Sequence, residues 1–136
     1  MADLHEIQKN VVRRWFEEVW NRGRREAIDE MLTKEAVLHD GREEIRGPEE
    51  FKRFYDDLQN ALTDIHVEIV QMMAEDNVVF ARWVSTAKAK GSDRHVEITG
   101  MSVVRFDGDT MQEAWQNWDK YGLMEQLQAK AAGSTS

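Results

Sequence analysis

Asp119 is the carboxylate whose neighbours point most directly to chemistry. Three aromatic residues surround it in the chain, Trp115, Trp118 and Tyr121. If its side chain points inward, the carboxylate is poorly solvated and suited to exchange a proton with a ligand near neutral pH. The alternative is structural, because an aspartate just before residues 122–124 is a common helix N-cap. The sequence leaves both roles open.

His39 and Asp40 form a second candidate acid/base pair, at the end of a predicted strand. Adjacent strand residues face opposite sides, so only one of the two reaches a pocket. An aspartate before Gly41 commonly forms a turn. We therefore expect His39 to face the pocket and to assist Asp119 in catalysis.

Several other side chains are candidates for holding a ligand. Five tryptophans in a short chain suit a flat apolar ligand, although they are equally typical of a core. Arg82 lies mid-strand, where it either binds a ligand oxygen or pairs with Glu97. The residues that we expect to contact a ligand are Phe16, Trp20, Arg82, Met101, Trp115 and Asn117.

A metal site is not expected from this sequence. There is no cysteine, and the histidines and acids near Asp40 and His95 lack the same-face spacing of metal ligands. We predict a site that uses neither a metal nor a cofactor.

The helices that would position these residues show clear periodicity. Apolar residues three to four apart predict a helix over 4–20, broken at 21–23, and a shorter helix over 28–32. Gly47-Pro48 opens another helix that ends at 63–64, because proline suits the first helical position.

Alternation with a period of two then predicts strands. A short strand at 36–39 precedes the third helix, and a meander of four antiparallel strands follows it, at 65–69, 78–90, 95–106 and 111–118. Helices on one face of a long, bent antiparallel sheet give an α+β cone that encloses one apolar pocket. A helical turn near 123–127 closes the domain, which spans 1–128, and a disordered tail spans 129–136.

Composition restricts the partners. The chain has 136 residues, of which 41% are hydrophobic, enough for one core. Its net charge of −8 disfavours nucleic acid, and no apolar stretch approaches the roughly 20 residues that span a bilayer. We expect a cytoplasmic protein that binds a small hydrophobic ligand. Apolar residues on the second sheet face also predict a homodimer.

The chain resembles the SnoaL-like polyketide cyclases of the nuclear-transport-factor-2-like cone fold. The resemblance covers residues 11–127 and rests on the order of VVRRWFEEVWNRG, GPEEFKRF, VVFARW, VEITGMSVVRFDGD and EAWQNWDKYGL. It implies that a carboxylate near the end of the last strand acts as acid/base in an intramolecular aldol ring closure without metal or cofactor. Asp119 in NWDKYGL holds that position.

Two other branches of the fold match less well. Ketosteroid isomerases need a tyrosine, an aspartate and a carboxylic acid where this chain has Phe16, Asp40 and Ser102. Limonene epoxide hydrolases need an aspartate two residues after Arg82, which is absent. We therefore expect a cyclase or isomerase acting on a hydrophobic carbonyl compound. The alternative is a non-catalytic ligand-binding or dimerisation module.

Overall fold

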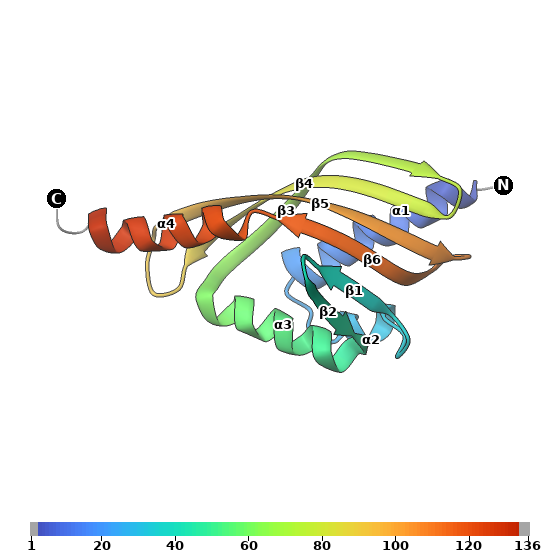
Figure 1. The fold of residues 1–136 in the computed structure, drawn as a ribbon, viewed down its shortest axis with the longest axis horizontal. Helices are drawn as coiled ribbons and strands as arrows, with labels where there is room; N and C mark the ends of the chain where they lie inside the picture. The colour runs from blue at the N-terminus through green and yellow to red at the C-terminus, as the bar shows by residue number, and fades with distance from the viewer. Residues whose placement is uncertain (1–2, 134–136) are drawn as a thin grey trace.

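The computed structural model describes residues 3–133, which form one six-stranded sheet with helices packed against it (Figure 1). The helices are α1 (Leu4–Trp15), the π-helix η1 (Phe16–Asn21), α2 (Ala27–Met31), α3 (Gly47–Ala61) and α4 (Lys120–Gly133). The strands are β1 (Val37–Asp40), β2 (Glu43–Arg46), β3 (Leu62–Glu75), β4 (Val78–Ala89), β5 (His95–Asp107) and β6 (Thr110–Trp118). The predicted α+β fold is confirmed.

The strand order is β2-β1-β6-β5-β4-β3, and every neighbouring pair is antiparallel except β1 with β6. The predicted meander is therefore present as β3 to β6. Strand β2 was not predicted, because only Ile45 among its four residues is buried and no alternation marks it. The parallel pairing places Asp40 opposite Gln116.

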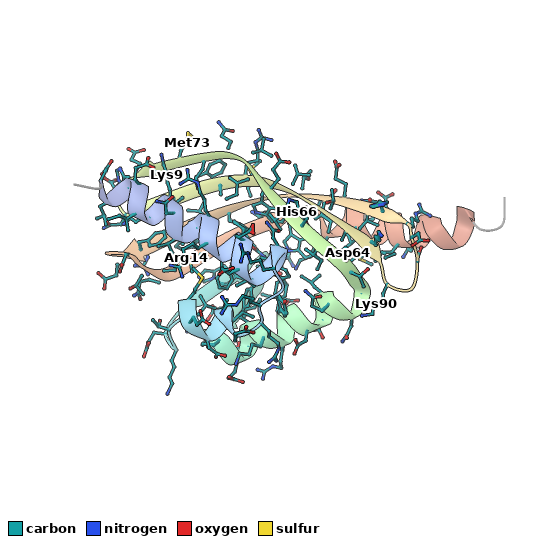
Figure 2. All side chains as sticks on the ribbon, turned by 180° about the vertical axis from the view of Figure 1, so that it is seen from behind. Lys9, Arg14, Asp64, His66, Met73 and Lys90 are labelled. Carbon is teal, nitrogen blue, oxygen red and sulfur yellow. The ribbon has the colours of Figure 1, made fainter. Side chains whose placement is uncertain are left out.

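Burial alternates along the strands and distinguishes an inner from an outer sheet face. On β4 the odd-numbered residues are buried, and on β5 the even-numbered residues are buried. The inner face is covered by α1, which crosses it, while β3 runs along the edge of the sheet (Figure 2). Val12 of α1 and Val19 of η1 are fully buried in the core.

Asn21 fixes the end of η1 to the edge strand. Its side-chain amide donates to Val67 O at 3.0 Å, and its Oδ1 accepts from Val67 N at 2.6 Å. This pair of bonds imitates a neighbouring strand, between the two irregularities in β3. The predicted helix break at 21–23 therefore coincides with an anchor.

The C-terminal helix is longer than the helical turn that we expected. Helix α4 continues to Gly133, so part of the tail predicted at 129–136 is helical, and residues 134–136 lie outside the described residues. Of the described helices, none combines the length and the apolar character needed to cross a membrane.

Candidate functional site

The helices and the inner sheet face line a partly open cavity of about 120 Å³. A single water needs only about 10–15 Å³ of such space, so the cavity has room for a small organic molecule. Its walls are mainly apolar, and Phe16 and Trp20, both predicted to contact a ligand, are among them. The ring centroid of Trp20 lies 5.0 Å from that of Tyr55 and 6.2 Å from that of Phe51.

Polar side chains enter the cavity from the strands. Ser85 of β4, Ser102 of β5, and Gln112, Glu113 and Gln116 of β6 line it. Three polar positions follow one row of the sheet, because Ser102 pairs with Gln116 on β6 and Gln116 pairs with Asp40 on β1. A polar row thus crosses a wall that is mainly, though not entirely, apolar.

The indole of Trp83 helps to form this polar row. Its Nε1 donates to Ser102 Oγ at 3.0 Å, and both side chains are buried. Trp83 pairs with Gly100 on β5, and a Cβ at that glycine would lie only 2.3 Å from Trp83 Cζ2. The missing side chain at Gly100 thus gives the indole room to reach Ser102.

Asp40 is the buried carboxylate of this region, with 1% of its surface exposed. Its Oδ1 accepts from Gln116 Nε2 at 3.1 Å and from Trp118 Nε1 at 2.9 Å. Lys120 Nζ lies 2.7 Å from Oδ2, at ion-pair distance but without hydrogen-bond alignment. Gln116 and Trp118 both line the cavity, so Asp40 stands directly behind its polar wall.

His39 lies on the face opposite to the one that we expected. Its ring stacks on that of Trp115 at 5.3 Å, and its Nε2 lies 2.6 Å from Glu113 Oε2. Arg105 contacts the other oxygen of Glu113 at 3.1 Å. The hydrogen bonds with His39 and then Arg105 lower the pKa of Glu113. The expected orientations of His39 and Asp40 are therefore exchanged: His39 lies on the outer face and Asp40 faces inward.

Asp119 is exposed and serves as the N-cap of α4. Its Oδ1 accepts from Gly122 N at 2.8 Å, and its own backbone N–H donates to Thr99 O. The capping alternative is what the geometry shows. The carboxylate does not belong to the cavity lining, so its catalytic role stays a prediction.

Four residues that we expected to contact a ligand lie on the outer sheet face instead, namely Arg82, Met101, Trp115 and Asn117. Arg82 Nε lies 3.4 Å from Gln71 Oε1, so its neighbour is not the expected Glu97. Met101 and Trp115 are about half exposed. The reason is parity: the even-numbered side chains of β4, and the odd-numbered side chains of β5 and of β6 from Trp115 onward, point away from the helices.

Sequence reasoning missed Gln116 altogether and considered Ser102 only as a missing acid. The signal that would have found them is the same alternation. Once one inward residue is known, alternate positions of β5, and of β6 beyond its register shift, face inward, and these include Ser102 and Gln116.

The described residues hold no cluster of side chains suited to a metal ion. Within residues 3–133, no three histidine, aspartate or glutamate side chains gather in an arrangement suited to a metal ion. Asp40 has nitrogen donors rather than further carboxylates around it.

Solved structures with the same fold span nearly the whole chain. A proposed polyketide cyclase from Acidithiobacillus ferrooxidans is 25% identical, with a TM-score of 0.80, and the match covers 94% of this chain and 99% of that one. IdmH, a proposed polyketide cyclase from Streptomyces antibioticus, is 18% identical, with a TM-score of 0.77 and coverages of 88% and 97%.

A third similar structure, from Catenulispora acidiphila, has a ketosteroid isomerase-like fold and contains trimethylamine. It is 14% identical, with a TM-score of 0.75, and the match covers 85% of this chain and 90% of that one. No functionally curated protein matches the chain by sequence. The family model of the SnoaL-like domain matches residues 12–114, most of the chain. The resemblance seen in the sequence is confirmed, and the chain belongs to the SnoaL-like domain family.

Proposed function

We propose that this protein binds a small apolar carbonyl compound in the cavity and moves a proton at the carbon next to the carbonyl. Such a step is part of a ring closure or isomerisation that needs no cofactor. The observation that carries the proposal is the buried carboxylate of Asp40, joined through Gln116 and Trp118 to the cavity wall. The polyketide cyclase names of the similar structures support the class of substrate.

Burial and proximity to the cavity support Asp40 over Asp119 as the acid/base group. Neither carboxylate lines the cavity, but Asp40 is bonded to two side chains that do, Gln116 and Trp118. Asp40 Oδ1 is fixed by two N–H donors, whereas Oδ2 has only the contact with Lys120. The lysine side chain is 43% exposed, so it has room to swing away and free Oδ2 for a proton. Ser102 is positioned on the same wall to donate a hydrogen bond to a developing enolate oxygen.

Exchange of carbon-bound hydrogen tests this proposal without knowledge of the natural substrate. The protein is incubated with 1-tetralone in D₂O, and loss of the signal from the protons next to the carbonyl is followed by NMR. We expect Asp40→Asn to slow the exchange by about 10²-fold or more. Asp119→Asn is the matched control, because asparagine is an equally good N-cap.

Each result of this assay leads to a different conclusion. Exchange that persists in Asp40→Asn but disappears in Asp119→Asn would assign the acid/base role to Asp119 and overturn that of Asp40. Binding of 1-tetralone with no exchange above the buffer rate would support the second candidate function, a non-catalytic module for hydrophobic ligands. The mainly apolar lining of the cavity favours this second candidate.

We also propose that a second copy of the chain covers the outer sheet face. Met73, Phe80, Val103 and Trp115 follow one another in register across β3, β4, β5 and β6. The two ends of this row are the most open, with Met73 54% and Trp115 41% exposed. A row of this kind buries well against an identical row turned by a two-fold axis, which sets Trp115 of one copy over Met73 of the other.

A further inference from the structure

The hydroxyl of Ser102 is free to donate a hydrogen bond. A serine hydroxyl has one proton and two acceptor positions, and here Oγ accepts from Trp83 Nε1. Among the described residues, no acceptor receives the Ser102 proton in a hydrogen bond. Because Ser102 lines the cavity, that proton is available to an acceptor oxygen of a ligand.

The side-chain oxygen of Gln116 is free to accept a hydrogen bond, because Asp40 fixes the orientation of the amide. A carboxylate only accepts hydrogen bonds, so the NH₂ group of Gln116 must be the one that faces Asp40 Oδ1. A flipped amide would set its oxygen against Oδ1, which Trp118 Nε1 holds in place. Gln116 also lines the cavity, where its Oε1 can accept from a ligand.

These two groups are neighbours on one wall. Ser102 and Gln116 are directly paired on the antiparallel strands β5 and β6, and both face inward. Side chains in such pairs have Cβ atoms about 4.5–5.5 Å apart. The cavity thus presents one hydrogen-bond donor beside one hydrogen-bond acceptor.

We propose that Ser102 and Gln116 select ligands that carry a carbonyl and a hydroxyl group on the same edge, with the carbonyl on Ser102 and the hydroxyl on Gln116. Hydroxyaryl ketones and the enol forms of dicarbonyl compounds have this pattern. The inference rests on the proposed binding of a carbonyl compound. Asp40 is a positioning residue here, because it fixes the orientation of the Gln116 amide.

Four bicyclic probes of similar size test the selection by isothermal titration calorimetry on the full chain. 7-Hydroxy-1-tetralone has both groups, and 1-tetralone has only the carbonyl. 5,6,7,8-Tetrahydro-2-naphthol has only the hydroxyl, and tetralin has neither. We expect 7-hydroxy-1-tetralone to bind about tenfold more tightly than either single-group probe. Equal affinities for 7-hydroxy-1-tetralone and tetralin would overturn the proposal without any substitution in the protein.

Two variants then assign the groups. Ser102→Ala should weaken the binding of the two ketones by about fivefold and leave the binding of the naphthol unchanged. Gln116→Met should weaken the binding of the two hydroxyl probes only. Thr86→Ala, at an exposed threonine of β4 outside the cavity lining, is the control and should leave all four affinities unchanged. A change by one common factor for all four probes in Ser102→Ala or Gln116→Met would overturn the assignment.

The role of Asp40 has its own readout. In Asp40→Asn the side chain at position 40 can also donate, so the Gln116 amide is free to turn. We expect the preference for 7-hydroxy-1-tetralone over 7-methoxy-1-tetralone, which cannot donate, to shrink to about twofold or less. An unchanged preference in this variant would overturn the positioning role. Because these are equilibrium measurements, they can succeed even where the deuterium exchange assay fails.

Discussion

Gln116 and Asp40 lie opposite each other on the parallel strands β6 and β1, and the Gln116 amide donates to Asp40 Oδ1 at 3.1 Å. Trp118 and Lys120 bring two further donor groups to the same carboxylate. The aspartate therefore connects β1 to the end of β6 and to the start of α4.

Asp40→Ala should destabilise the protein, because it leaves the donors of Gln116 and Trp118 without their acceptor. The expected loss in free energy of unfolding is about 1–3 kcal/mol. Urea unfolding followed by circular dichroism measures it. Asp40→Asn is the control, since its side-chain oxygen still accepts, and it should lose less. Equal losses for the two variants would contradict a role for these hydrogen bonds.

Asn21→Ala should detach the end of η1 from β3. The substitution removes both hydrogen bonds to Val67 and leaves that residue's backbone groups unpaired, at an expected cost of about 1–3 kcal/mol. Asn10→Ala, at an exposed asparagine of α1, should change stability by no more than about 0.5 kcal/mol. Similar unfolding midpoints for the two variants would show that the anchor contributes little.

Gly122→Ala should destabilise the protein when residue 119 is aspartate and stabilise it when residue 119 is alanine. A Cβ at Gly122 would lie 2.0 Å from Asp119 Oδ2, so the alanine displaces the capping side chain, which contributes about 0.5–2 kcal/mol. In the background of Asp119→Ala there is no cap to lose, and the higher helix propensity of alanine should stabilise by up to about 1 kcal/mol. Thermal unfolding of the two single variants and the double variant tests this reversal. The same sign in both backgrounds would contradict it.

Glu113 should make stability depend on pH in the acid range. Its pKa is lowered in the folded protein by the hydrogen bonds with His39 and Arg105. Between the folded and the unfolded pKa the unfolded chain binds more protons, so stability falls as the pH is lowered through this interval, below the ordinary value of 4.5. Glu113→Gln should flatten this part of the profile, as measured by urea midpoints at a series of pH values. An unchanged slope would show that other carboxylates dominate.

Trp115→Glu should prevent the dimer that we expect the wild-type protein to form. We expect the wild type to sediment near twice its chain mass of 15.9 kDa, and the variant, with a charge in the exposed apolar row, near the chain mass. Leu4→Glu, at an exposed leucine of α1, is the control and should leave the mass unchanged. A wild type that sediments as a monomer would end the dimer proposal.

The fold was largely accessible from the sequence, because period-two alternation and helix start signals are local. The long strands β4 and β5 follow such a pattern without interruption. Strand β2 was not accessible, since its pairing with β1 involves exposed and charged residues and only Ile45 is buried. The parallel pairing of β1 with β6 joins distant segments and has no local signal.

The site was less accessible, because alternation reveals two faces without saying which one the helices cover. Met101 and Asn117 were therefore assigned to the pocket, whereas their neighbours Ser102 and Gln116 face it. Asp40 was hidden for another reason. An aspartate before a glycine reads as a turn former, and only the register with Gln116 shows that its side chain is buried behind the cavity.

The parallel pairing of β1 with β6 also orders the assembly of the molecule in time. The hydrogen bonds from Gln116 and Trp118 to Asp40 span 76 and 78 residues of sequence, among the longest separations in the fold. Closing so large a loop costs entropy that local contacts do not incur. During synthesis, Asp40 leaves the ribosome long before its partners exist, so the polar wall is completed only after the final strand has emerged.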